Sequence, residues 1–442
     1  MARWAGRIGV EGAFSTTLSS TASKKGGIIM TKGLRSLVVG VVLLSGLAAS
    51  CEALAAEDYR LGVVLGITGP GAGYSKDGLD AIKLAVEQIN GNGGFLGKYM
   101  IKTFVADDQS KRDVVGELTK ELILRDGVRC VLGTYASDCA IIIKSVCKEH
   151  KVLHIAAISN SENITLTNFS PYTFSVAPNS YMQASASAIG IARMAKRYNW
   201  KDFVTIGSDY DWGRSTQANL VKLLKEKAPE LILKKEFWPK LGESDYGPYI
   251  EAIIELKPSF AYGIFGSDDA AAWINQAKQR DFFSKVPYPG SLIDVWVLIN
   301  RASTQPRGMI GLCRAPFFAH LDVPLMVEFI KAFRAKYERY PSDWAVMAYD
   351  GVYALKQGIE KAGSIDSDAV KDAMKEMTIE TTRGKLYFRG IDNQLSCSSY
   401  LGRVADDPAY PFPVYQSLIE VKGPESWRAD AEIVAARAAE KK

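Results

Sequence analysis

The stretch "GITGPGAGYSKDGLDAIKLAVEQIN", residues 66–90, joins an apolar run to a helical pattern through a glycine-rich loop. Many proteins hold a phosphate in a loop of this kind. Here the glycines fit neither G-x-G-x-x-G nor G-x-x-x-x-G-K-[ST], and Pro70 removes a backbone donor that a phosphate cradle needs. We therefore expect no nucleotide at this loop.

The helix after the loop is predicted to start near residues 75–78, too late for the glycines to lie at its N-terminus. Four apolar residues then share one helical face: Leu79, Ile82, Val86 and Ile89. Asp107 and Asp108 end the next strand, too far on for the acid that binds a ribose, which lies roughly 20 residues downstream. The loop still lies at the carboxyl edge of a sheet, where open α/β folds bind ligands.

Segments of strand and helix character alternate along the rest of the chain. The first series has strand-like runs at 59–67, 99–108, 128–135, 152–159 and 172–178. The alternation restarts with strand-like runs at 202–210, 232–239, 260–266 and 286–293. Two successive β-α-β series without a long linker predict an α/β protein with two doubly wound parallel sheets and a cleft between them.

Length and charge are those of a globular protein. The chain has 442 residues, of which 47% are hydrophobic and 23% charged, enough for two or three domains. Residues 1–56 carry six Lys/Arg and two Asp/Glu, which leaves 48 basic and 47 acidic residues and a net charge of +1. This balance indicates neither a nucleic acid nor an acidic membrane surface as partner.

Residues 30–56 have the pattern of a secretory signal peptide. Lys32 and Arg35 precede an apolar run, 37–49, and the small residues around Ala55 give a cleavage site at Ala55/Ala56. A membrane anchor, the alternative, needs roughly 20 apolar residues, so we expect no stable membrane insertion after cleavage. A lipoprotein modified at Cys51 is a weaker alternative, because Ala48 stands where leucine is preferred. Residues 1–29 are interpreted as an over-long N-terminus.

Cysteine and histidine usage argues against a metal centre and against catalysis. Five cysteines follow the signal peptide, an odd number that leaves at least one thiol free: Cys130, Cys139, Cys147, Cys313 and Cys397. There is no C-x-x-C and no G-x-S-x-G, and the three histidines are spread over apolar or helix-end positions. We expect no cofactor, no metal and no enzymatic activity.

At four stretches the chain resembles a known family, the periplasmic solute-binding proteins of branched-chain amino acid ABC transporters, with their type I periplasmic binding fold. The stretches are residues 68–110, 122–140, 209–215 and 263–283. Their order and spacing carry the resemblance, which runs from about residue 59 to 404.

The resemblance implies two Rossmann-like lobes joined by three crossing hinge strands, near 174–177, 311–315 and 395–401. The implied lobe ranges are 58–176 plus 314–395 for the first lobe, 177–313 plus 396–422 for the second, and 423–442 for a C-terminal tail that either docks as a helix or frays.

The same resemblance implies a ligand site between the lobes. From the first lobe it implies Tyr74, Tyr135, Ala136, Ser137, Ile158, Ser159 and Asn160. From the second lobe it implies Tyr210, Trp212, Phe265, Gly266 and Asp294. Ser137 or Asp138 is expected to cap a helix from Cys139, with Asp138 turned away from a bound carboxylate.

Two positions bear on the kind of solute. Asn160 replaces the threonine of the family pattern, and the two prolines of that pattern are absent. Asp294 is the candidate to hold a ligand ammonium. If Asp294 does not reach the cleft, the solute is expected to lack an ammonium, and Trp296 could wall an aromatic acid. A disulfide between Cys313 and Cys397, on neighbouring crossing strands, is the alternative to free thiols there.

The implied function is that of the exported substrate-binding component of an ABC importer. Such a protein captures a small solute, here a branched-chain or other apolar amino acid or an aromatic carboxylate, by hinge closure. It delivers the solute to a membrane permease with ATPase subunits. The alternative is a periplasmic sensor of an amide, urea or an amino acid that feeds a regulator.

Overall fold

The computed structural model describes residues 57–289 and 291–440, and residues 56–442 form one compact unit. The expected N-terminal extension 1–29, the signal peptide 30–56, its cleavage site and Cys51 lie outside the described residues. Within the described part of the chain, no helix is long and apolar enough to cross a membrane.

The first lobe is built on a five-stranded parallel sheet in the order β2-β1-β3-β4-β5. Its strands are β1 Glu57–Leu65, β2 Tyr99–Asp107, β3 Cys130–Gly133, β4 Leu153–Ala156 and β5 Thr173–Ser175. All residues of β3, β4 and β5 are buried. Burial on both faces of a parallel sheet explains why these strands read as apolar runs and not as an alternating pattern.

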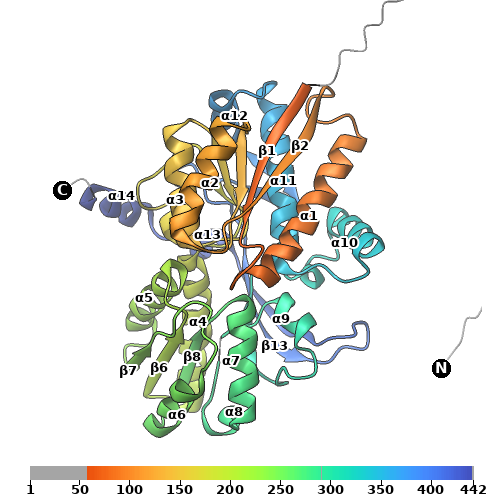
Figure 1. The fold of residues 1–442 in the computed structure, drawn as a ribbon. Helices are drawn as coiled ribbons and strands as arrows, with labels where there is room; N and C mark the ends of the chain where they lie inside the picture. The colour runs from red at the N-terminus through yellow and green to blue at the C-terminus, as the bar shows by residue number, and fades with distance from the viewer. Residues whose placement is uncertain (1–56, 290, 441–442) are drawn as a thin grey trace, which may run out of the picture. The chain divides into compact units, whose positions relative to one another are not determined.

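Helices cover both faces of this sheet (Figure 1). Helices α2 (Arg112–Leu124) and α3 (Ser137–Glu149) pack together on one face. On the other face, α1 (Ala72–Gly91) packs against α11 (Asp343–Ala362) and α10 (Pro324–Tyr337), and α12 (Ser367–Met374) packs on α11.

The apolar face predicted for helix α1 is confirmed, but the predicted first residue of the helix is wrong. Ile82 and Ile89 are buried, and Leu79 and Val86 are half-buried. The helix begins at Ala72, before residues 75–78, because the Ser75 backbone N–H donates to the carbonyl of Gly71 and closes the first turn earlier. The glycines of the loop therefore do lie at the helix N-terminus.

The second lobe contains a three-stranded parallel sheet in the order β7-β6-β8. Its strands are β6 Asp202–Gly207, β7 Ile232–Phe237 and β8 Phe260–Ile264. Five helices accompany it: α4 Ser180–Tyr198, α5 Asp211–Lys227, α6 Gly247–Leu256, α7 Ser267–Gln279 and α8 Phe282–Lys285. Figure 1 shows α4 and α5 on one side of the sheet and α6 to α8 on the other.

A four-stranded sheet, β14-β13-β10-β9, extends the second lobe. Its strands are β9 Ser291–Leu292, β10 Ile310–Cys313, β13 Ser399–Ala405 and β14 Val414–Val421. Strands β9 and β10 are parallel, whereas β10 with β13 and β13 with β14 are antiparallel. The strand predicted at 286–293 is wrong in its extent: among its described residues the strand covers only Ser291–Leu292, and α9 (Val295–Asn300) follows.

The chain leaves the first sheet beside a returning segment. The Ser175 N–H donates to Asn393 O over 3.1 Å, and the Leu395 N–H donates to Ser175 O over 2.9 Å. Just before this return, β11 (Thr378–Thr381) and β12 (Gly384–Tyr387) form a two-stranded ribbon. The lobe boundaries given above remain a prediction.

The C-terminal segment is docked on the protein. It contains α13 (Gly423–Ser426) and α14 (Asp430–Ala439). Between them, Arg428 contacts Glu162 in the short helix η1 (Glu162–Ile164) and Asn219 in α5. One arginine thus joins residues of the first and second series of elements.

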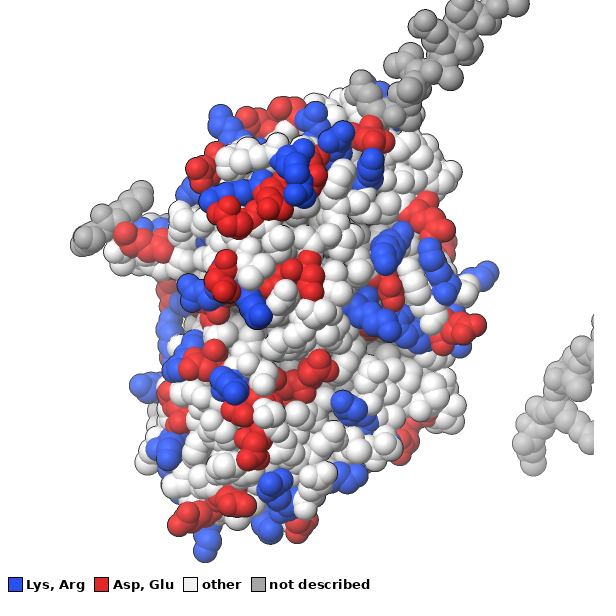
Figure 2. Space-filling model, viewed as in Figure 1, with Lys and Arg blue, Asp and Glu red and all other residues white. Residues whose placement is uncertain are grey.

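On the face shown in Figure 2, Lys and Arg side chains lie interspersed with Asp and Glu. In the described part of the chain as a whole, many basic groups are paired with acids, for example Arg214 with Asp209 over 2.7 Å and Arg307 with Asp406 over 2.8 Å. Exposed pairs of this kind contribute little to stability.

Candidate ligand-binding site

A cavity lies where the loops of the two lobes meet. About 220 Å³ of space there is free of protein atoms, including space open to solvent, and a water-sized sphere can occupy only about 10 Å³ of it. Its lining comes from the loops after β1, β3 and β4 in the first lobe and after β6 and β8 in the second. Arg314, which follows β10, and Trp344 at the start of α11 complete it. The cavity therefore occupies the carboxyl edges of both parallel sheets, the place where open α/β sheets bind ligands.

The structure brings most of the predicted ligand residues together. Eight of the twelve line this cavity: Tyr74, Tyr135, Ser137, Ile158, Asn160, Tyr210, Trp212 and Gly266. A larger, open hollow of about 830 Å³ near Met194 and Trp200 contains none of the twelve. We therefore take the smaller cavity as the candidate site.

Ser137 lies at the start of α3, and its role differs in detail from the prediction. The helix begins at Ser137 itself and Ala136, which is buried, is the N-cap, so no side chain caps it. The Ser137 Oγ accepts the Ser161 N–H over 3.2 Å and joins the two first-lobe loops. Asp138 turns away from the cavity, where its carboxylate accepts the Asp211 N–H over 3.4 Å.

The loop after β4 is held by one hydrogen bond to the loop after β3 and by one within itself. The Ser159 N–H donates to Thr134 O over 2.7 Å, and the Asn160 amide donates to Ile158 O over 3.0 Å. Ser159 is buried next to the cavity without lining it. Asn160 donates one amide hydrogen within its own loop, and the residue also lines the cavity.

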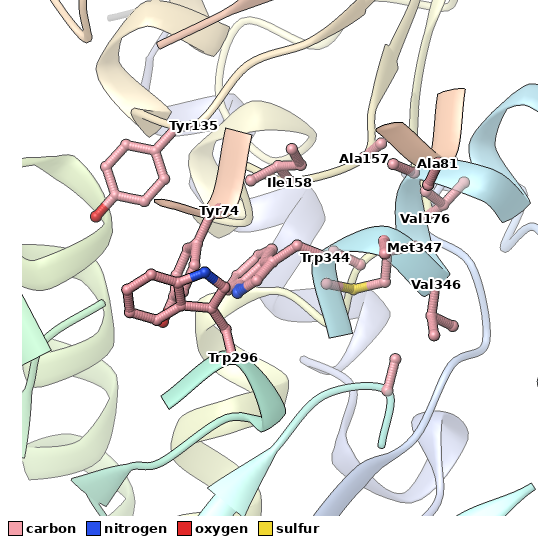
Figure 3. Packing of buried hydrophobic residues seen from close by; sticks show 14 of the residues in the cluster. Tyr74, Ala81, Tyr135, Ala157, Ile158, Val176, Trp296, Trp344, Val346 and Met347 are labelled. Atoms are coloured by element: carbon pink, nitrogen blue, oxygen red, sulfur yellow. The ribbon is translucent and has the colours of Figure 1, made fainter. Parts of the chain in front are cut away.

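Aromatic rings form most of the cavity wall. Tyr74 stacks on Trp344 with ring centroids 4.3 Å apart, and Trp296 meets the edge of Tyr74 at 5.4 Å (Figure 3). Tyr135 of the first lobe stacks across the cleft on Tyr210 of the second, with centroids 6.3 Å apart. Trp296 supports Tyr74 and does not line the cavity itself.

Gly73 makes this packing possible. A Cβ atom at Gly73 would collide with the Trp296 ring, whose Cε2 lies 2.8 Å from that position. Gly71 is equally close to the Tyr135 ring. The glycine-rich loop thus serves to let α1 approach the aromatic side chains of the cleft.

Asp294 is fully buried, and its contacts point to an internal role. Its carboxylate accepts the Tyr74 hydroxyl, the Trp344 Nε1–H over 3.3 Å and the Val297 N–H over 3.1 Å as the N-cap of α9. Burial raises the pKa of this carboxyl. Asp294 positions two wall residues, and it does not line the cavity.

Phe265 points into the second lobe. Its ring stacks on Trp273 at 5.3 Å and meets Tyr246 edge-on at 5.4 Å. The following residue, Gly266, faces the cavity instead, 3.3 Å from Tyr74 when a Cβ is placed on it. The prediction that Phe265 reaches the ligand is not matched by this placement, since the side chain belongs to the core.

Sequence reasoning missed Arg314, which lines the cavity and is 1% exposed. Its Nη2 donates to Gln183 Oε1 over 2.9 Å, while Nε and Nη1 have no hydrogen-bond partner. The guanidinium carbon lies 4.5 Å from the ring centroid of Trp344 and 5.1 Å from that of Trp212. A charged residue inside the apolar run "GLCRAPFF" was the available signal.

Asp343 lies behind Arg314, also fully buried. Its Oδ2 accepts the backbone N–H of Arg314 over 3.1 Å. Burial, followed by repulsion from Asp294, raises the pKa of Asp343 to about 7. The acid therefore titrates near neutral pH beside the cavity without lining it.

The disulfide considered as an alternative to free thiols is not formed in the structure. Cys313 and Cys397 are both free, buried thiols. Each faces a different carbonyl: the Cys313 thiol donates to Ile293 O over 3.3 Å and the Cys397 thiol to Leu395 O over 3.4 Å. Among the described residues, no group of three His, Cys, Asp or Glu side chains is placed to hold a metal ion.

Comparison with known proteins identifies the family of the chain. The family profile described as "Periplasmic binding protein" matches residues 58–409. The leucine-, isoleucine-, valine-, threonine- and alanine-binding protein of Pseudomonas aeruginosa is 24% identical over 365 residues, covering 81% of this chain and 93% of its own.

Solved structures share the fold. A solute-binding protein of an ABC transporter from Rhodopseudomonas palustris, solved with 3,4-dihydroxybenzoic acid, has a TM-score of 0.73 at 20% identity, covering 85% of this chain and 99% of its own. A leucine-binding protein from Thermotoga maritima has a TM-score of 0.71 at 18% identity, covering 81% and 98%. With its profile match over most of its length, the chain belongs to the periplasmic binding protein family.

Proposed function

We propose that this protein is the exported solute-binding component of an ABC importer. It captures a small solute between its lobes and presents the closed form to a membrane permease served by ATPase subunits. It binds and releases the solute without chemical change. The observation that carries this proposal is a single cavity lined jointly by Tyr74 and Ser137 of the first lobe and Trp212 and Gly266 of the second.

Hinge closure explains how such a site works. Because the walls come from both lobes, a solute completes its contacts only when the lobes approach each other. The solute then shifts the population toward the closed form, by as much as it binds that form more tightly. The permease needs only to distinguish closed from open protein.

The cavity suits a small and largely apolar solute. In this form the space that a water-sized sphere can occupy is only about 10 Å³, far below the roughly 300–1,000 Å³ of sites for drug-sized ligands, so the lobes must part to admit a solute. One relative is named for leucine, isoleucine, valine, threonine and alanine, and structural neighbours were solved with aromatic acids. We propose that this protein takes a solute of one of these two kinds, each of which carries a carboxylate.

A thermal-shift screen of residues 57–442 tests the proposal. The panel is L-leucine, L-valine, benzoate, 4-hydroxybenzoate, benzamide and urea. A solute at 100 times its Kd stabilises the folded state by about 2.7 kcal/mol. We expect at least one carboxylate to raise Tm and to lower the radius of gyration in X-ray scattering, as closure requires.

Two tryptophan variants locate the binding. Trp212→Ala removes a cavity wall and is expected to abolish the shift, whereas Trp238→Ala, on the same lobe but outside the cavity, is expected to leave it intact. A shift that survives Trp212→Ala and is lost in Trp238→Ala would contradict the proposed site.

A further inference from the structure

We infer that Arg314 is the carboxylate anchor of the cleft, and that the solute it selects is a flat aromatic monocarboxylate without an ammonium group. This inference rests on the proposed function and names the substrate class of the same site. It joins three observations: the unpaired donors in the cavity, the charges of its lining and the aromatic walls.

The unpaired polar atoms of Arg314 and Trp212 are all donors. The lining leaves Arg314 Nε, Arg314 Nη1 and Trp212 Nε1 buried without a hydrogen-bond partner, together with the Tyr135 hydroxyl, which can donate or accept. Guanidinium and indole N–H groups donate and cannot accept. Buried donors are costly when unpaired, so the site is complementary to a group that offers only acceptors, as a carboxylate does.

Arg314 is held ready for this role. Its Nη2 is fixed by Gln183 of α4, and its guanidinium lies against the rings of Trp344 and Trp212, which come from different lobes. A guanidinium fixed in this way loses little further entropy on binding. Arg314 directly follows β10, so a strand and not a long loop fixes its backbone.

No acidic residue lines the cavity. Among the described residues that form its wall, Arg314 is the only charged one. Asp294 is behind the wall, with its oxygens engaged by Tyr74, Trp344 and Val297. An amino acid would bring an ammonium into a site that offers it no carboxylate, and desolvating that charge without a partner is unfavourable. The lining therefore discriminates against a zwitterion.

The walls fit a flat ring. Five aromatic side chains surround the space: Tyr74, Tyr135, Tyr210, Trp212 and Trp344. Aromatic rings favour stacked and edge-to-face contacts with another ring. A branched aliphatic side chain has no ring with which to make these contacts.

Calorimetric titration with three matched probes tests the inference. Benzoate and benzamide have the same flat shape and differ in charge, and L-leucine adds an ammonium on an aliphatic body. We expect benzoate to bind about 10-fold or more tightly than benzamide, because a hydrogen bond to a charged group is worth more than a neutral one. We expect L-leucine to bind more weakly than benzoate.

Variants distinguish the loss of carboxylate binding by Arg314 from a loss of folding. Arg314→Gln is expected to bring the affinities for benzoate and benzamide together. Arg314→Lys keeps the positive charge near Asp343 and is expected to lower benzoate affinity about 10-fold. Trp212→Phe keeps a ring and removes one donor, and it tests the same pairing if both Arg314 variants fail to fold. Arg307→Gln, a surface arginine paired with Asp406, is the control.

The outcomes are distinct. Tight binding of L-leucine that is unchanged in Arg314→Gln or Trp212→Phe would overturn the inference while the proposed function stands. The same holds if benzoate and benzamide bind equally to the wild-type protein. If neither these probes nor any solute of the thermal-shift panel binds, the proposed function itself fails, and the inference with it.

Discussion

Asp343, which is buried behind Arg314, makes the stability of the folded protein depend on pH. The groups that face it are Asp294, Arg314, Cys313 and Tyr415. Its folded-state pKa of about 7 lies above the ordinary value of 3.8. Between these two pH values the unfolded chain has released a proton that the folded protein retains. Stability therefore falls as pH rises from about 4 to 7, and this contribution is constant above 7.

We predict that Asp343→Asn flattens this dependence. The amide cannot ionise, and its oxygen can still accept the Arg314 N–H. The fall in Tm between pH 5 and pH 8 should be smaller than in the wild type, as differential scanning fluorimetry can measure. Asp269, whose pKa burial raises to about 6, acts in the same direction and leaves a residual slope. Parallel curves for the two proteins would count against the assignment.

At the scale of one element, helix α1 offers a matched pair of glycine substitutions. Gly73→Ala places a methyl group into the Trp296 ring, and overpacking of this kind costs about 1–3 kcal/mol. Gly91→Ala, in the last turn of the same helix, meets no atom within 4 Å and should be neutral or slightly stabilising. Urea denaturation of both variants checks this, and equal midpoints would refute the packing role of Gly73.

The C-terminal element gives a second prediction. Arg428 binds Glu162, which is 7% exposed, through Nε at 2.9 Å and Nη2 at 2.8 Å. Arg428→Ala leaves that carboxylate buried without its cation, and we expect a loss of roughly 2–4 kcal/mol in the free energy of unfolding, because breaking a buried pair is costly. The double variant with Glu162→Gln should lose less than the sum of the two single variants in urea denaturation.

At the scale of the whole molecule, closure is the property that matters. Outside the cavity, the Asn163 amide of η1 donates to Asp211 Oδ2 of α5 over 3.0 Å. This hydrogen bond links the first lobe to the second, so it favours the closed form without touching the cavity lining.

We predict that Asn163→Ala weakens solute affinity by about 3- to 10-fold, since one hydrogen bond contributes roughly 1 kcal/mol. The effect should appear as faster solute release in stopped-flow fluorescence, because lobe separation precedes release. Asn92→Ala, whose amide bonds Gln88 within the first lobe, is the control. An unchanged release rate in Asn163→Ala would show that the hydrogen bond does not contribute to closure.

The sequence by itself determined the alternation of strands and helices, the buried face of α1 and the strand-to-helix connections near Ser137, Asn160 and Trp212. These features depend on local periodicity and on the position of a loop after its strand, which a single sequence displays. The two lobes and the cleft follow from that alternation together with the family resemblance.

Only the tertiary structure decided which side chains meet in the cleft. Arg314 reaches the cavity because β10 pairs with β13, residues about ninety positions further along the chain. Phe265 turns into a core formed with Trp273, and Asp294 is taken up by Tyr74 and Trp344. Such contacts join residues far apart in sequence. A local sequence pattern does not show whether a buried charged side chain contacts another residue of the protein or a bound ligand.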